Sequence, residues 1–128
     1  MKPARILSAL LALNRIAFGA NYLARPQSAG PSWIGRRVAR TTGGQLMVRS
    51  QAARDIGLGL GALWALAHGR DDEARRWMAA HALADGVDTA VTFAARGRLP
   101  NDGAPALRIG GASTAVALLG ATRLRGDE

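Results

Sequence analysis

Four polar side chains interrupt an otherwise apolar segment between residues 81 and 92. In order along the chain, they are His81, Asp85, Asp88 and Thr92. Because their spacings are four, three and four residues, an α-helix would present all four on a single face. An imidazole and two carboxylates can accept or donate protons, and metal ions also use them as ligands. This polar stripe predicts a site on the helix face that turns toward the rest of the chain.

Ionisable groups at the centre of apolar helices need counter-charges, because burying an unpaired charge is costly. Counted from the expected helix ends, Arg15 and Asp85 lie at a similar, central depth. Arg54 and Asp88 both lie nearer the side where the second long helix begins. We therefore predict that each arginine pairs with the aspartate at its own depth, with Asp55 adjacent. Two arginines then face three aspartates, and the surplus carboxylate must be protonated, paired with the charged imidazole of the polar stripe, or reached by water.

Three functions are open to these charges. In the first, the Arg–Asp pairs only fix how the helices pack, and Arg54 extends its guanidinium toward the nearer interface. In the second, Asp85 or Asp88 acts as an acid or base while the arginines hold an anionic or carbonyl group. The third is a metal site at His81 and the two aspartates, which we disfavour because no second histidine lies within reach on the same helix. We favour a structural or binding role over an enzymatic one, expect no metal and no cofactor, and name Asp85 and Asp88 as the catalytic candidates.

The composition indicates one helical domain spanning residues 1–128. Apolar residues make up 48% of the chain and aromatic residues only 5%, and β-branched residues are scarce. The absence of cysteine excludes disulfides and thiolate chemistry. The net charge of +8 comes from arginine, since Lys2 is the only lysine, and no segment combines a continuous basic face with interleaved aromatic residues. We therefore expect no nucleic-acid partner and assign the arginines to a membrane surface.

Four apolar segments joined by polar turns predict four helices. Proline and glycine punctuate the connections, and Thr42 with Gln45 has the form of a capping box at the start of the second helix. A basic start makes the first segment similar to a secretory signal peptide, but Asn14 and Arg15 interrupt its apolar run. The expected helices cover residues 6–24, 43–68, 74–95 and 104–124.

Small residues recur every four positions along the second helix, at Ala53, Gly57, Gly61 and Ala65. Such a small-residue ridge lets another helix approach closely, either within the chain or from a second copy. Each glycine would cost a soluble helix up to about 1 kcal/mol relative to alanine, whereas membrane helices tolerate glycine. The ridge therefore favours a lipid environment.

A membrane fits the pattern of charges better than water does. Three of the four segments lack the broad charged face of a soluble amphipathic helix. Trp33, Trp64 and Trp77 lie close to segment ends, where membrane proteins place aromatic rings. We predict an all-α fold, a four-helix up-down transmembrane bundle that is multi-pass in the cell membrane, with an interfacial linker at residues 25–42. The expected partners are membrane lipids, a second copy or another membrane protein. A soluble helical bundle is the alternative, because the mean hydropathy is near zero.

These features together resemble a known group of membrane proteins. The shared features are the central Arg15 of the first helix, Pro26 after its end, Trp33 and Gly35 in the linker, the block Arg49–Leu60 with its core Ala-Arg-Asp-Ile-Gly-Leu-Gly, and Asp85 with Asp88 in the third helix. They are similar to small bacterial DoxX-like membrane proteins, and more closely to the uncharacterised four-helix families grouped with them and common in actinobacteria. The resemblance implies a four-helix integral membrane protein of unassigned activity.

Overall fold

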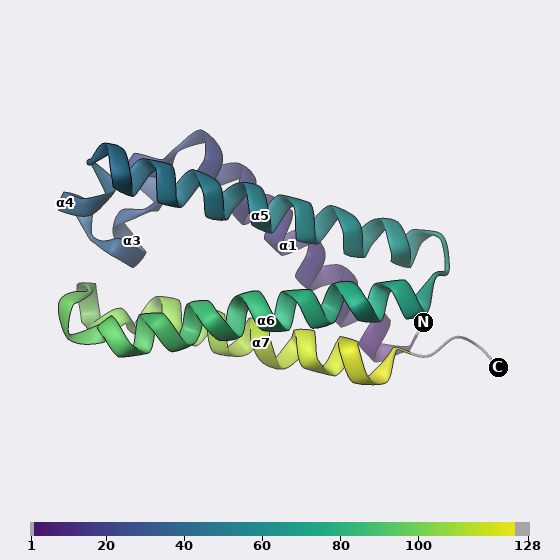
Figure 1. Ribbon diagram of the computed structural model, residues 1–128. Coiled ribbons are helices and arrows are strands. Elements are labelled where there is room, and N and C mark those ends of the chain that lie inside the picture. Colours follow the sequence, from purple (N-terminus) through teal and green to yellow (C-terminus); the bar gives the residue numbers. More distant parts are fainter. Residues whose placement is uncertain (1, 125–128) are drawn as a thin grey trace.

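The structure is a computed structural model that describes residues 2–124, and these residues form an all-helical fold without strands (Figure 1). The long helices are α1 (Pro3–Ala24), α5 (Thr42–Ala67), α6 (Asp71–Ala95) and α7 (Ala104–Arg123). Three single-turn helices join α1 to α5, namely α2 (Pro26–Ala29), α3 (Pro31–Ile34) and α4 (Arg36–Ala39). Two 3-10 turns join α6 to α7, namely η1 (Arg96–Arg98) and η2 (Pro100–Gly103). The long helices lie over the four expected segments, although α1 and α6 each begin earlier than expected.

Local sequence sets where the helices begin. A proline occupies the first turn of α1, α2 and α3, where its missing N–H is not needed. At the start of α5, the N-cap is Thr41, whose hydroxyl accepts a hydrogen bond from the Gly44 amide at 2.9 Å. Gly44 lies against the Val38 carbonyl, where a side chain would clash. The N-cap expected at Thr42 is therefore wrong by one position, and the expected capping box with Gln45 does not form, because the third helical position is Gly44.

The long helices form two antiparallel pairs (Figure 1). α1 packs along α5 and α6 packs along α7, and the pairs meet through α5 with α6 and α1 with α7. At the end of the molecule where α1 begins and α7 ends, Arg5 forms an ion pair with Asp71 and donates a hydrogen bond to the Leu66 carbonyl. These contacts tie the start of α1 to the turn between α5 and α6. At the opposite end, α3 packs against η2 and α7.

α1 and α5 approach each other closely at two glycines. A Cβ atom added to Gly19 would lie 2.7 Å from the Ala52 carbonyl oxygen. A Cβ atom added to Gly59 would likewise lie 2.7 Å from the Ala12 carbonyl oxygen. The two helices therefore pack backbone against backbone, which is the contact that small residues allow.

The predicted small-residue ridge of α5 does not pack as one surface within the chain. Ala65 is buried and Gly61 lies against a tryptophan ring, but Ala53 and Gly57 are exposed. The cause is the rotation of the helix. Asp55 faces α1, and a residue two positions away on an α-helix points about 200° away from it.

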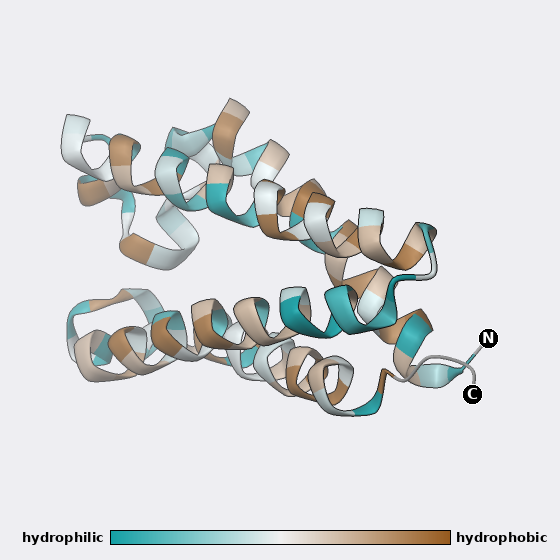
Figure 2. Ribbon diagram, turned by 45° about the vertical axis from the view of Figure 1, so that its right-hand side comes forward, coloured by the Kyte–Doolittle hydropathy of each residue, from teal (hydrophilic) through white to brown (hydrophobic). Residues whose placement is uncertain are grey.

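Hydropathy identifies two segments that are long and apolar enough to cross a membrane, Pro3–Ala24 and Pro100–Arg123. In the most apolar stretch of the second segment, only 11% of the residues are buried inside the structure. α5 and α6 fall short because both carry several charged residues, and Figure 2 shows hydrophilic residues gathered at the turn between them and in the first turns of α6. Hydropathy alone therefore supports two of the four expected spans and does not support a multi-pass protein.

Two glycine substitutions test the contact between α1 and α5. Gly59→Ala should lower the free energy of unfolding by about 1–3 kcal/mol, because the added methyl group forces the helices apart. Gly57→Ala is the matched control, since nothing lies within 4 Å of a Cβ atom there. It should raise the free energy of unfolding by up to about 1 kcal/mol, because alanine is the better helix former. Chemical denaturation followed by circular dichroism measures both changes, and equal effects would contradict the close approach.

Candidate functional site

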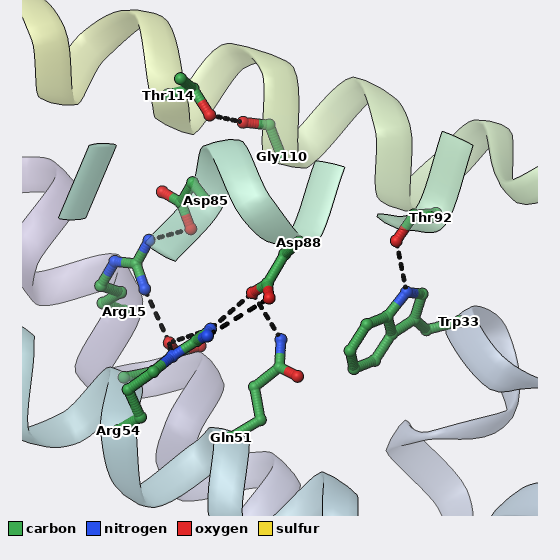
Figure 3. A network of polar contacts seen from close by, with 10 residues as sticks. Arg15, Trp33, Gln51, Arg54, Asp85, Asp88, Thr92, Gly110 and Thr114 are labelled. Carbon is green, nitrogen blue, oxygen red and sulfur yellow. Dashed lines mark hydrogen bonds and ion pairs between the residues drawn. The ribbon is translucent and has the colours of Figure 1, made fainter. Parts of the chain in front are cut away.

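Five charged side chains from three helices meet in the interior (Figure 3). α1 contributes Arg15, α5 contributes Arg54 and Asp55, and α6 contributes Asp85 and Asp88. We call these five residues the charge cluster. Both arginine–aspartate pairs expected from the sequence are present in it. The cluster lies where the α1–α5 pair of helices meets α6, so its contacts hold the two pairs together.

Arg15 links all three helices of the cluster. Its Nη1 lies 2.6 Å from Asp55 Oδ1, and its Nη2 forms an ion pair with Asp85 Oδ1. Only 5% of Arg15 is exposed, so these contacts are made away from solvent. Hydrogen bonds between two charged groups are stronger than neutral ones, and a buried guanidinium without them would be strongly unfavourable. Arg15 can therefore be buried only where α5 and α6 both bring a carboxylate to it.

Arg54 forms the second pair on the more exposed side of the cluster. Its Nη1 and Nη2 contact the two carboxylate oxygens of Asp88 at 3.2 and 2.5 Å, which is a bidentate arrangement. Nη2 also lies 3.1 Å from Asp55 Oδ1. Gln51 donates a further hydrogen bond to Asp88 Oδ2 at 2.9 Å. Because the Arg54 side chain is 35% exposed, solvent screens this pair more than it screens Arg15.

The surplus carboxylate expected from the sequence is shared between the two arginines. Asp55 Oδ1 accepts hydrogen bonds from both Arg15 and Arg54. Two guanidinium groups thus contact all three aspartates, because Asp55 Oδ1 bridges between the two arginines. Among residues 2–124, no hydrogen-bond partner is found for Asp85 Oδ2, which is a buried oxygen of the cluster.

His81 lies outside the charge cluster. It is fully buried, one turn before Asp85 on α6. The backbone of Leu58 lies close to the ring, but neither ring nitrogen makes a hydrogen bond of ordinary geometry within residues 2–124. The pairing of a charged His81 with the surplus acid, one of the three alternatives considered from the sequence, is therefore wrong. The described part of the chain also brings no three His, Asp or Glu side chains together as a metal site.

Thr92, the last residue of the polar stripe, anchors the linker. It is buried, and its hydroxyl accepts a hydrogen bond from Trp33 Nε1 at 3.2 Å (Figure 3). Trp33 lies on α3, so this bond ties α3 to α6. The sequence predicted an interfacial linker around Trp33 and did not predict this contact. The chemistry of the two side chains could have predicted the contact. A partly buried indole N–H needs a hydrogen-bond acceptor, and the hydroxyl of Thr92 is a polar group within an apolar segment.

A cavity of about 150 Å³ lies beside the charge cluster. Asp85, Asp88 and Thr89 line its polar side. Gly110 of α7 lies against the Thr89 hydroxyl, where a side chain would not fit. The apolar lining comes from α1, α3 and α7, at Leu11, Phe18, Tyr22, Trp33 and Ile109. The sequence did not predict this cavity, because the cavity depends on how four helices are rotated against one another.

The cavity has a mixed lining, in which apolar side chains stand beside polar ones contributed by α1, α3, α5, α6 and α7. Apolar walls with some polar groups are typical of small-molecule sites. Asp85 Oδ2 and Thr89 Oγ1 have no hydrogen-bond partner among the described residues, but both atoms are buried and have almost no accessible surface. The η nitrogens of Arg15 and Arg54 already contact carboxylates.

No protein-family model, curated protein or solved structure matches this chain. The resemblance to DoxX-like proteins therefore stays a prediction, and a function has to be argued from the geometry of the charge cluster and the cavity.

Replacement of Arg15 tests whether the charge cluster holds the helices together. Arg15→Met should lower the free energy of unfolding by about 3–5 kcal/mol, because two buried carboxylates lose their counter-charge. Arg108→Met is the matched control, since Arg108 is exposed on α7, and should change stability by about 0.5 kcal/mol or less. Chemical denaturation of both purified variants measures the difference. An Arg15→Met variant as stable as the control would contradict the role assigned to the cluster.

Proposed function

We propose that this protein is a small integral membrane protein, a four-helix up-down transmembrane bundle whose cavity binds a small amphiphilic molecule. α1, α5, α6 and α7 would cross the membrane, and α2–α4 would lie at the interface. The charge cluster would hold α1, α5 and α6 together around the cavity. The observation that carries the proposal is the distribution of polar and apolar side chains, which is the reverse of that in a soluble helical protein.

Polar side chains are buried and large apolar side chains are exposed. The buried polar residues include Arg15, His81, Asp85 and Thr92. Large apolar residues are exposed on all four long helices, among them Leu10, Leu13, Leu60, Leu83, Val87, Val91, Ile109 and Leu118. Soluble monomers rarely expose large apolar patches, whereas lipid-facing helices must be apolar outside and must pair their charges inside.

The charges in the middle of α5 and α6, at Arg54, Asp55, Asp85 and Asp88, do not lie on the exposed faces of these helices. Every exposed residue is apolar between residues 53 and 64 of α5 and between residues 79 and 94 of α6. The same holds between residues 109 and 121 of α7. Mean hydropathy counts the internal charges as though they faced lipid. It therefore underestimates how well these two helices suit a membrane.

Helix length and packing also suit a membrane. α7 is the shortest of the four long helices at 20 residues, or about 30 Å, which equals the thickness of a bilayer's hydrocarbon core. The buried apolar residues are mostly alanines, namely Ala12, Ala39, Ala52, Ala62, Ala65, Ala74, Ala82 and Ala117. Membrane helices pack through small residues in this way, because large apolar side chains gain nothing by leaving lipid.

The cavity supports a binding role in addition to a structural one. Its volume of about 150 Å³ is similar to that of an engineered apolar cavity that binds benzene. A second candidate is an acid–base site acting on a hydrophobic molecule, and it is favoured by Asp85, a buried carboxylic acid among the residues that line this cavity. In that case Asp85→Asn would abolish the reaction even when the activity is measured per amount of protein that still folds.

Membrane extraction tests the first part of the proposal. Alkaline carbonate should leave the protein in the membrane pellet, and detergent should release it, because the apolar outer faces are solvated by lipid. Immunoblotting of pellet and supernatant measures the partition. Release by carbonate without detergent would overturn the membrane assignment and favour the soluble helical bundle.

Exchange of two charges tests the structural role of the cluster. Arg54→Asp and Asp88→Arg should each lower the free energy of unfolding by about 1–3 kcal/mol, because each leaves like charges in contact. The double variant should recover most of the loss, because an arginine and an aspartate again face each other between α5 and α6. Denaturation of the three variants gives the coupling energy. Additive losses in the double variant would contradict a direct interaction.

A further inference from the structure

We propose that the end of the bundle that carries the α1–α5 and α6–α7 connections binds the headgroups of acidic phospholipids. The inference goes beyond the binding of a small molecule in the cavity, and it rests only on the membrane part of the proposed function. Two properties of this end support it, namely exposed arginines without acidic partners and large apolar side chains exposed beside them.

The two connections bring six arginines to one end of the molecule (Figure 1). The α1–α5 connection at residues 25–41 and the α6–α7 connection at residues 96–103 lie together there, because α3 packs against η2. Asp102 is the only acidic residue in these two ranges of the sequence. The arginines are all exposed, and they are Arg25, Arg36, Arg37, Arg40, Arg96 and Arg98. We call this surface the arginine end.

The positive charge of the arginine end is not neutralised within the described part of the chain. None of its six arginines forms an ion pair with a residue between positions 2 and 124. The opposite end differs, because acids in the first turn of α6 neutralise arginines there. Glu73 forms an ion pair with Arg70 at 2.9 Å, and Asp71 forms one with Arg5. The attraction for anions is therefore concentrated at the arginine end.

Large apolar side chains are exposed beside these arginines. Leu23 lies two residues before Arg25, and Val38 follows the arginine pair on α4. Phe93 is exposed at the end of α6, and the Cζ atom of Arg96 lies 3.9 Å from the centroid of its ring. At the boundary of a bilayer, arginine extends its charge toward the phosphates while apolar side chains enter the hydrocarbon. This mixture favours a lipid partner over a nucleic acid, which offers phosphates but no acyl chains.

The number of arginines favours acidic phospholipids over zwitterionic ones. A guanidinium group binds phosphate oxygens through two parallel hydrogen bonds. In phosphatidylcholine the positive choline offsets the charge of the phosphate, whereas phosphatidylglycerol keeps one net negative charge. Several arginines close together add their attraction for a net negative charge. We therefore expect the arginine end to select lipids by their net charge.

Lipid titrations followed by native mass spectrometry test this selectivity. The full-length protein in a non-ionic detergent is titrated with phosphatidylglycerol or with phosphatidylcholine that carries the same acyl chains, and the populations of lipid-bound protein give the affinities. Phosphatidylglycerol should bind about tenfold more tightly, because its net charge is attracted by more than one arginine. Equal affinities for the two lipids would overturn the inference.

A triple variant places the bound lipid at the arginine end. Replacement of three exposed arginines, Arg36→Gln, Arg37→Gln and Arg40→Gln, removes half of the positive charge of this surface without breaking an ion pair. The preference for phosphatidylglycerol should fall from about tenfold to about twofold or less. Circular dichroism verifies that the variant is folded.

The matched control removes the same charge from the opposite end. Arg70→Gln, Arg76→Gln and Arg123→Gln replace three exposed arginines there. This variant should keep the roughly tenfold preference for phosphatidylglycerol, because the arginine end is unchanged. Equal losses of preference in the two triple variants would overturn the assignment to the arginine end.

The remaining outcomes separate this inference from the proposed function. Tighter binding of a short DNA duplex than of phosphatidylglycerol, measured by fluorescence anisotropy and lost in the arginine-end variant, would overturn the choice of a lipid partner. Equal affinities for the two lipids would leave the membrane assignment and the cavity in place. Release of the protein by carbonate would instead overturn the membrane assignment and this inference together.

Discussion

The burial of Arg15 is the constraint on which the rest of the structure depends. Its guanidinium is neutralised from α5 and α6 at once, which fixes the rotation of both helices. α5 turns Asp55 inward, and its residues two positions away therefore point outward. α6 turns Asp85 inward, and Leu83 and Val87 are left 70% and 52% exposed on the opposite side. The buried charges between the helices and the exposed apolar side chains on the opposite side of α6 are thus two results of one ion-pair geometry.

The sign of each charge and its distance from the ends of its predicted helix were enough to predict which arginine pairs with which aspartate. The two arginine–aspartate pairs followed from matched positions along apolar segments, and the helix ranges followed from the turns between them. Contacts that depend on helix rotation could not be predicted in this way. Periodicity shows which side chains share a face, but it does not show which neighbour that face meets. The sharing of Asp55, the bond from Trp33 to Thr92 and the cavity all depend on that information.

The charge cluster and the cavity arise from the same arrangement of helices. The two helix pairs are joined near their middle by the cluster, at one end by Arg5 with Asp71, and at the other by Trp33 with Thr92. The interior between them is built mainly from alanine and glycine, while the larger apolar side chains lie outside. Small residues allow the helices to approach closely where they touch, but they leave unfilled space next to these contacts. The cavity is such a space, and it lies beside the charged side chains that join the two helix pairs.

The position of Arg15 on the first helix also sets an order of events during biosynthesis. Asp55 follows it by 40 residues, and Asp85 is synthesised later still. A ribosome needs about 2–8 s to add 40 residues at its usual rate. During that interval α1 carries an unpaired arginine, which costs about 2.5–3.5 kcal/mol at the centre of an inserting helix. In a membrane, α1 would have to remain with the insertion machinery until α5 and α6 emerge, so the nascent chain would integrate as a group of helices and not one helix at a time.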